Sequence, residues 1–562
     1  MQLSGPVQKT EQTKPMRSRK RCTSAPLLLY HTQPEHSATH PLAQFMMSVT
    51  FLNLSPFQNT MHYAAVLTLT LSTLTLGISN PHHAQAQAPD PAQAPDPAQA
   101  PDPAPAPAPA PWQKTNEQIP NLESLPDSTT KLQSLIDSQE GSVLLTEKFY
   151  RITRPLIIDL AKHGATAITS QTGSTVIMTG PGPAISVLGN HTGTASPKSF
   201  LSQTWNERMP TFSGFEILGG HPQANGIHLK QTVGAILKQM SIRWCHHGVH
   251  LTLRNRNVII SDCHLYENAG VGLYLDDVNL HQINVSNSHI SYNREGGIVV
   301  RDGNVRNLQV TGCDIEGNMP DNTTATNTAN IWLDVSGSQD DPAKSIAEIA
   351  ITGNTIQHAA NYGAKNEKTI APGGANIRLS GKEIYPINSV TITGNVLSDT
   401  STLIDIRHSH DVTISGNTFF APMPNNLTIE DSQRIVVSTN TFNPRQFVRP
   451  GIIRFTNSKD CILANSTLFR LATDRGGVQF SGCSGCLLNG LLLSECESGI
   501  RFANTDNTTI SNCRISGTPK GSFDLLVDES NQKINLMSNS FSGFTVFNPS
   551  SGEGKPNTAS GQ

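Results

Sequence analysis

The chain has 562 residues and an almost balanced charge, with 40 Lys and Arg against 43 Asp and Glu and a formal net charge of −3. This balance gives no reason to expect nucleic acid or a membrane surface as a partner. The length could hold several ordinary domains, but the repeat described below argues for one long solenoid instead.

Residues 1–88 are predicted to be a leader that is not part of the fold. An apolar run at 64–79 has the length of a signal peptide and is short for a membrane-spanning helix, which needs about 20 residues. Small residues two apart at Ala84, Ala86 and Ala88 offer cleavage sites. We therefore expect a secreted, periplasmic or cell-surface protein that has no membrane insertion after signal cleavage. Because the region just before the run lacks Lys and Arg, one hypothesis places the true start at Met46, Met47 or Met61.

Residues 89–112 alternate Pro with Ala and Asp, which predicts an extended, semi-rigid linker. The segment 129–140 follows, with Leu132, Leu135 and Ile136 at helical spacing and Asp127 or Ser128 available as an N-cap. We expect a short helix there, followed by strands up to residue 159.

A rung of β-branched residues ending in a small polar residue then recurs, as in VIISDCHL (258–265), INVSNSHI (283–290), VTISGNTF (412–419) and IVVSTNTF (435–442). Such a period, with short strands and polar turns, is typical of a solenoid whose turns bury one continuous core. The equivalent positions, at spacings of 22 to 26 residues with two of 41, are Cys263, Ser288, Cys313, Asn354, Asn395, Asn417, Asn440, Asn465, Asn489, Cys513 and Asn539.

The rung and the helix before it resemble the right-handed parallel β-helix of the pectin-lyase-like superfamily. The resemblance covers roughly 122–547 and implies an all-β, single-stranded right-handed parallel β-helix (solenoid) with a short N-terminal capping helix. We expect this fold over 113–548 and a disordered tail at 549–562. The superfamily implies exported proteins that bind or cleave acidic polysaccharides, although a fold does not settle function.

Each rung contains a second strand of the pattern small, apolar, x, apolar, x, whose x positions should point outward because strand residues alternate between faces. Stacked rungs turn the x positions into two columns, which together we call the stripe. The first column is His228, His250, Tyr274, Val299, Trp332, Arg378, Asp405, Arg454, Gln479 and Arg501. The second is Lys230, Thr252, Asp276, Arg301, Asp334, Ser380, Arg407, Thr456, Ser481 and Ala503.

The stripe supplies the candidate catalytic residues Asp276, Asp334, Arg301 and Arg378. Asp276 and Asp334 are separated by one intervening rung, that of Arg301, so we expect a distance of roughly 9–10 Å between them. This is near the upper end of the approximately 6.5–9.5 Å between the carboxylates of inverting glycosidases. Arg301 or Arg378 could neutralise a uronate. Calcium fits the lyase interpretation, with Asp276 and Asp334 as oxygen ligands, but no cluster of three acids supports it and no metal residues are assigned.

The candidate substrate-binding residues combine aromatic rings with charged or polar groups. Tyr274 and Trp332 could stack on sugar rings, and Arg407 could bind carboxylates or sulfates. The remaining members of this set are His250, Asp405 and Tyr362. A solvated ladder of opposite charges is the alternative interpretation of the same stripe.

Two insertions, at 318–329 and 357–375, enter just before stripe strands and should wall the same groove. The second contains His358, Tyr362 and Lys365, any of which could be the base that a polysaccharide lyase requires. The residues do not match the polygalacturonase set or the Asp-Pro-His-Asp motif of alginate epimerases, so the resemblance supplies no catalytic residues by motif.

Nine cysteines are present, and Cys22 would leave with the leader. Cys263, Cys313 and Cys513 share the slot of the rung asparagines, which an inward stack of small side chains explains without disulfides. Cys483 and Cys486 form a lone CxxC at a turn, without a second pair at zinc spacing.

Two classes of function remain open on the sequence. The first is an exported enzyme, a lyase or hydrolase, that acts on an acidic polysaccharide in a groove along the β-helix. The second is a non-catalytic carbohydrate-binding or structural surface protein that uses the same stripe.

Overall fold

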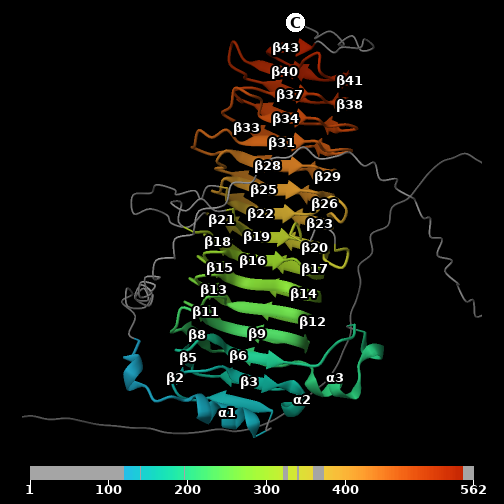
Figure 1. Ribbon diagram of the computed structural model, residues 1–562. Coiled ribbons are helices and arrows are strands. Elements are labelled where there is room, and N and C mark those ends of the chain that lie inside the picture. Colours follow the sequence, from blue (N-terminus) through green and yellow to red (C-terminus); the bar gives the residue numbers. More distant parts are fainter. Residues whose placement is uncertain are drawn as a thin grey trace, which may run out of the picture. The chain divides into compact units, whose positions relative to one another are not determined.

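The computed structural model describes residues 119–547 except 139–140, 195, 321–326, 338–340 and 359–372. The predicted leader, linker and tail lie outside these residues. Within them, short parallel strands from successive turns lie side by side and form a stack of turns (Figure 1). This arrangement confirms the predicted parallel β-helix.

The first ladder of strands contains the stripe, and its outward side is called the stripe face. It consists of β3 (Leu156–Asp159), β6 (Gly182–Leu188), β9 (Ala224–Val233), β12 (Val249–Ser261), β14 (Val271–Ser286), β16 (Gly296–Arg301), β19 (Ala329–Asp334), β22 (Ala375–Ser380), β25 (Thr402–Arg407), β28 (Asn425–Glu430), β31 (Ile452–Thr456), β34 (Val478–Ser481), β37 (Ile500–Ala503), β40 (Phe523–Val527) and β43 (Phe544–Phe547).

The second ladder contains the β-branched anchor strands and shares β12 and β14 with the first, because these two strands run through both faces. Its other members are β1 (Ser142–Leu145), β4 (Ala167–Ser170), β7 (Thr211–Ser213), β10 (Ile236–Lys238), β17 (Asn304–Thr311), β20 (Ser345–Thr352), β23 (Ile387–Thr393), β26 (Ser409–Ser415), β29 (Gln433–Ser438), β32 (Ile462–Ala464), β35 (Leu487–Asn489), β38 (Asp506–Ser511) and β41 (Gln532–Met537).

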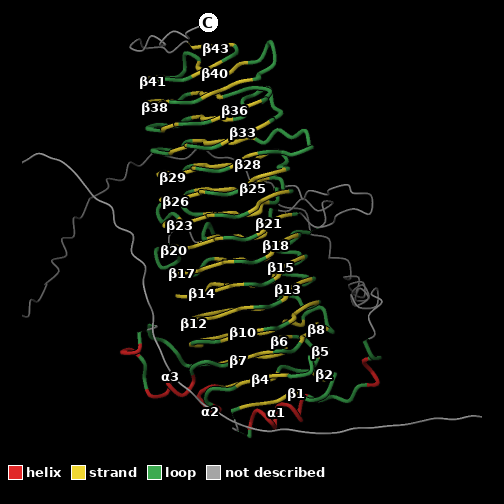
Figure 2. Tube along the Cα trace, turned by 180° about the vertical axis from the view of Figure 1, so that it is seen from behind, coloured by secondary structure: helices red, strands yellow, loops and turns green. Residues whose placement is uncertain are grey.

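The third ladder is a separate 15-stranded sheet of two- to four-residue strands (Figure 2). Its members are β2 (Phe149–Ile152), β5 (Thr175–Met178), β8 (Glu216–Gly219), β11 (Ser241–Arg243), β13 (His264–Tyr266), β15 (His289–Ser291), β18 (Asp314–Glu316), β21 (Thr355–Gln357), β24 (Val396–Ser398), β27 (Thr418–Phe420), β30 (Thr441–Phe442), β33 (Thr467–Phe469), β36 (Leu492–Ser494), β39 (Arg514–Ser516) and β42 (Ser540–Phe541).

The first turns carry short helices. α1 (Thr129–Asp137) packs against β1 and β3 and buries Leu132 and Ile136, which confirms the predicted helix at the N-terminal end of the stack. Asp127, not Ser128, accepts the hydrogen bond from the backbone N–H of Thr129, at 2.9 Å. Leu135 is 44% exposed, contrary to a core role. α2 (Leu160–His163) and α3 (Ser202–Glu207) pack on each other, and the 3-10 turns are η2 (Leu122–Ser124) and η3 (Pro197–Ser199).

Inward residues of the three ladders form one continuous core of Ile, Val, Leu and Phe. A column of buried asparagines, Asn354, Asn395, Asn417 and Asn440, follows four successive anchor strands and holds neighbouring turns together. The amide of Asn395, for example, donates to Asn417 Oδ1 and to the backbone oxygen of Ile351, at 3.1 and 3.0 Å. Because buried polar groups must be paired, each asparagine links three consecutive turns.

Two members of the predicted column were wrong. The backbone N–H of Asn440 donates to Ser466 Oγ at 3.2 Å, so Ser466 and not the exposed Asn465 occupies the slot. On the next turn the buried Leu491 takes the place expected for Asn489, because Leu491 and not Asn489 precedes the third-ladder strand β36. A pattern of Asn, Ser and Thr around a tight turn does not identify which residue points inward.

The eight cysteines in the described residues are free and buried, and for Cys263, Cys313 and Cys513 this confirms the predicted inward stack. A hydrogen bond with the neighbouring Cys461 thiol, together with burial, raises the pKa of Cys486 to about 12. The CxxC thiols are therefore packed core groups. None of the described helices is long and apolar enough to span a membrane.

Candidate functional site

The two predicted columns exist in the structure. His250 pairs with Tyr274, Tyr274 with Val299 and Val299 with Trp332, and the ladder continues to Arg378 and Asp405. The prediction missed one turn: β28 lies between the strands of Asp405 and Arg454 and adds Thr428 and Glu430 to the columns. Its sequence NLTIE, at 426–430, has the same pattern as the predicted stripe strands NIWLD at 330–334 and NIRLS at 376–380.

Several positions that should point into solvent are buried. Val299, Asp334, Arg378 and Asp405 are 1, 4, 5 and 6% exposed. Arg378 shows the reason, since its guanidinium donates to the backbone oxygens of Thr328 and Gly373, which lie near the C-terminal ends of the two insertions. The stretches of the insertions at 321–326 and 359–372, including Tyr362, lie outside the described residues.

Arg378 and Asp405 form a buried ion pair. Nε of Arg378 lies 3.0 Å from Asp405 Oδ2, and Thr428 Oγ1 donates to Asp405 Oδ1 at 2.7 Å. Burial lowers the pKa of Arg378, and the Asp405 carboxylate opposes that shift. These contacts hold both side chains in place, so their effect on a ligand is to shape the surface beside them.

A pocket of about 320 Å³ opens on the stripe face beside this ion pair. Its volume is at the lower end of the range for small-molecule sites, about 300–1,000 Å³. The side chain of Arg407 is 58% exposed and lies 3.6 Å from Glu430, measured between Nε and Oε2. The charged residues that line the pocket are Arg378, Asp405, Arg407, Glu430 and Arg454.

Trp332 lies between two arginines. The guanidinium carbons of Arg301 and Arg378 are 4.4 and 5.5 Å from its ring centroid, and its Nε1 donates to Ser380 Oγ at 3.0 Å. The two arginines, on the turns before and after that of Trp332, thus cover the faces of its ring. This geometry favours edge contacts with a ligand over the sugar stacking that the sequence suggested for Trp332.

His228, His250 and Tyr274 form a second stack, with ring centroids 5.1 Å apart at each step. Nε2 of His250 donates to Asp276 Oδ2 at 3.0 Å, in the tautomer that the carboxylate selects. Burial, reinforced by Asp276, raises the pKa of Tyr274 to about 12, so its hydroxyl stays protonated at neutral pH. The Tyr274 phenol and the Asp276 carboxylate therefore lie on the turn next to that of Arg301, and the His250 imidazole lies one turn further away.

Asp276 and Asp334 lie two turns apart with Arg301 between them, as predicted. Asp334 Oδ2 accepts from Arg301 at 3.0 Å, and its Oδ1 accepts from the backbone and hydroxyl of Ser336. Its hydrogen-bonding capacity is therefore used within the protein. Asp276, whose side chain is 37% exposed, is the more available carboxylate of the two.

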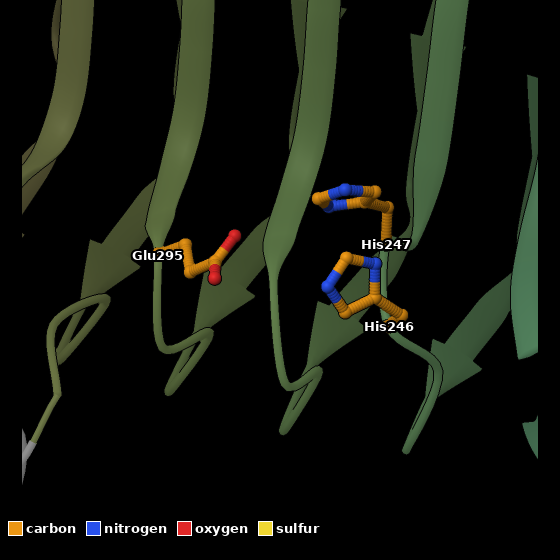
Figure 3. Close-up of side chains that lie close together, drawn as sticks. All are labelled: His246, His247 and Glu295. Atoms are coloured by element: carbon orange, nitrogen blue, oxygen red, sulfur yellow. The ribbon is translucent and has the colours of Figure 1, made fainter. Parts of the chain in front are cut away.

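The described residues contain one group of three potential metal ligands close enough to share an ion. It consists of His246, His247 and Glu295, on turns that flank the stripe strands (Figure 3). The sequence showed the two histidines but gave no reason to join them with Glu295. Asp276 and Asp334, expected as ligands for calcium, are not in this group.

Comparison with protein families matches the region of the described turns. Residues 206–340 match the right handed beta helix region family, and residues 348–553 match the family of the periplasmic copper-binding protein NosD. The described turns form a right-handed parallel β-helix. No curated protein sequence matches this β-helix.

Solved structures similar to this β-helix share little sequence with it. The A-module of mannuronan C-5 epimerase AlgE4 from Azotobacter vinelandii is 11% identical, with 78% of this chain and 96% of that chain covered and a TM-score of 0.38. A tailspike protein mutant of E. coli bacteriophage HK620, in complex with a hexasaccharide, is 14% identical, with 74% and 75% covered and a TM-score of 0.45. The catalytic unit of a GH87 alpha-1,3-glucanase from Streptomyces thermodiastaticus is 13% identical, with 76% and 68% covered and a TM-score of 0.35. At these values the likeness carries no argument about activity.

Proposed function

We propose that the protein is exported and binds an acidic polysaccharide along the stripe face. The observation that carries this proposal is the pocket between β22 and β31, where Arg407 and Arg454 line a cavity of monosaccharide size. Planar guanidinium groups bind carboxylates and sulfates with two parallel hydrogen bonds. The ion pair of Arg378 with Asp405 holds one wall of that pocket in place.

Neutral parts of a sugar also find partners in this pocket. Thr402, Thr428 and Thr456 line it together with Asn425. Hydroxyl and amide groups donate to and accept from sugar hydroxyls. Glu430, which is beside Arg407, would disfavour a densely charged polymer and favour one with alternating acidic and hydroxyl-rich units.

Export is supported by the apolar segment at 64–79, which lies outside the described residues, and by the similarity of 348–553 to a periplasmic family. A secreted, periplasmic or cell-surface location follows from the proposal. Measuring the N-terminus of the mature protein from its native host tests it; an intact leader on the accumulated protein would refute export.

Retention on immobilised uronate, sulfated and neutral polysaccharides tests the binding proposal. We expect retention on an acidic polymer that weakens as salt rises, and at least tenfold weaker affinity in Arg407→Ala. Arg514→Ala, which removes an exposed arginine from the third ladder, is the matched control and should bind as the parent does. Equal affinity of the Arg407→Ala variant and the parent would refute the pocket as the site.

A second candidate is cleavage of the bound polymer by a lyase or a hydrolase. The observation that favours it is the grouping of His250, Tyr274 and Asp276 with Arg301 on the next turn. Elimination next to a uronate carboxylate needs a base, an acid for the leaving oxygen and a cation on the carboxylate, and this grouping offers each type of group. Hydrolysis by Asp276 and Asp334 has less support, because Asp334 is committed to Arg301 and Ser336.

An activity screen on the same polysaccharides separates these outcomes. New reducing ends together with the ultraviolet absorbance of unsaturated uronates would identify a lyase, and Tyr274→Phe should then abolish turnover. Reducing ends alone would identify a hydrolase, with Asp276→Asn as the first variant. Binding without either product would leave the protein as a glycan-binding β-helix.

A further inference from the structure

Three side chains from two non-adjacent turns meet at the corner before the stripe strands. His246 and His247 lie in the turn before β12, and Glu295 lies in the turn before β16 (Figure 3). Each offers one ligand atom, and these atoms lie within 4.8 Å of one another. The turn between them, before β14, has Gly270 at the corresponding position. The backbone N–H of Gly270 donates to the His246 carbonyl, and the Gly270 carbonyl accepts from the backbone N–H of Glu295.

Gly270 makes this meeting sterically feasible. A Cβ at this position would lie 2.5 Å from His247 Nδ1 and 2.7 Å from the His246 carbonyl oxygen, closer than real contacts. Any other residue in this turn would fill the space over which the three side chains converge. The notch is therefore built by the absence of a side chain, an observation independent of the ligand types.

Two of the three groups are available to a ligand. Within the described residues, the ring nitrogens of His246 and the Glu295 carboxylate make no hydrogen bond or ion pair, and Glu295 is exposed. His247 Nδ1 accepts a hydrogen bond from the backbone N–H of Val271 at 3.0 Å. The lone pair of this ring is therefore on Nδ1, which faces the position that a Gly270 Cβ would occupy.

We propose that His246, His247 through Nδ1, and Glu295 bind one divalent transition-metal ion of the Zn²⁺ or Cu²⁺ type. Imidazole nitrogens favour these ions, whereas Ca²⁺ and Mg²⁺ favour all-oxygen sites. Three protein ligands leave a fourth position open on the solvent side, as in sites that hold a water or a substrate. The family match at 348–553 contains none of these residues, so the proposal rests on the geometry of the notch.

Binding requires two local adjustments. Ligand atoms of a tetrahedral site with bonds of about 2.1 Å are roughly 3.4 Å apart, so the exposed Glu295 side chain must move inward by about 1 Å. The metal also replaces the Val271 N–H as the partner of His247 Nδ1. We therefore expect moderate affinity, with His246 and Glu295 supplying most of it.

Isothermal titration of the untagged, chelator-treated full-length protein with ZnCl₂ and CuSO₄ tests the proposal, with CaCl₂ as the hard-ion comparison. We expect one Zn²⁺ or Cu²⁺ per chain with a Kd in the micromolar range or below, and no such event with Ca²⁺. Glu295→Gln and His246→Ala should each weaken binding at least tenfold. His289→Ala, from an exposed histidine stacked on His264 in the third ladder, should bind as the parent does.

Histidines elsewhere in the chain bind ions weakly, so the deciding comparison is between the parent and Glu295→Gln, whose exposed, conservative change leaves the fold intact. Electron paramagnetic resonance of the Cu²⁺ form adds a second measurement, with nitrogen couplings from two imidazoles in the parent and from one in His246→Ala. Absence of a stoichiometric event in the parent, or unchanged binding and spectra in both variants, would overturn the proposal.

Discussion

The buried ion pair between Arg378 and Asp405 predicts a large loss of stability when one partner is removed. The side chains are 6 and 8% exposed, and Asp405 also accepts from Thr428. Asp405→Ala would leave the Arg378 cation in a covered position without its carboxylate. Breaking a buried pair in this way costs about 3–5 kcal/mol, most of it from the uncompensated charge.

An exposed pair in the same protein is the matched control. Nε of Arg434 lies 2.7 Å from Asp411 Oδ1, and the two side chains are 47 and 51% exposed. Because solvent screens both charges, Asp411→Ala should cost less than about 1 kcal/mol. The two pairs have similar chemistry and distance, so a difference between the variants isolates the effect of burial.

Urea unfolding of the two variants, combined with hydrogen exchange over β22, β25 and β28, measures the loss. A repeat protein need not unfold in one step, so the exchange of these strands reports the local free energy. The double variant Arg378→Met with Asp405→Leu should recover most of the stability, since apolar residues of similar volume can replace a buried pair. Equal losses in Asp405→Ala and Asp411→Ala, or a double variant as unstable as Asp405→Ala, would refute the reasoning.

Three further predictions concern the stack of turns. Asn417→Ala removes hydrogen bonds from a 2% exposed side chain and should destabilise the fold by about 2–4 kcal/mol in urea unfolding. Asn465→Ala, at an exposed turn with a left-handed φ of 48°, should cost only about 1 kcal/mol, from backbone strain. Phe480→Ala removes a buried ring stacked at 4.5 and 5.4 Å between two others and should cost about 3–5 kcal/mol by the same measurement. Burial, with the nearby His250, lowers the pKa of His228 to about 4 from its ordinary 6.5. The free energy of unfolding is therefore fully present above about pH 6.5, where His228 is neutral in both states, and it falls as the pH drops toward 4, because the unfolded chain then binds a proton that the folded ring does not. Between neutral pH and pH 5 the shift corresponds to a loss of about 2 kcal/mol in the free energy of unfolding, which solvent screening of this half-buried ring reduces to about 1 kcal/mol. His228→Gln should remove that part of the pH dependence.

The periodicity of the sequence was sufficient to predict the columns of the stripe face. Alternation along each strand and stacking between turns are both local rules, and they placed His250, Tyr274, Trp332 and Arg378 correctly in one column. The turn at 425–430 was missed although its NLTIE has the same pattern as NIWLD and NIRLS, which the prediction included. The column was wrongly assigned to Asn465 instead of Ser466, because neighbouring Asn and Ser at a tight turn have similar propensities.

The environment of each column position could not be predicted from the same rules. Arg378 is buried because irregular stretches cover it, and these contain its partners Thr328, 50 residues away in sequence, and Gly373, five residues away. The notch of His246 and Glu295 depends on a glycine one turn away from each. The contacts between turns join residues 23 or more apart in the sequence, where single-sequence patterns carry no signal.

The two long strands β12 and β14 have a consequence for ligand binding. Each continues through the corner between the first two ladders, and only a one-residue irregularity near Leu253 interrupts their register. Elsewhere a new strand begins after that corner. The corner that supports His250 and Tyr274 is therefore cross-linked by backbone hydrogen bonds and should show high NMR order parameters before any ligand arrives. A ligand that binds there would lose little affinity to ordering the protein, so its affinity should depend mainly on direct contacts.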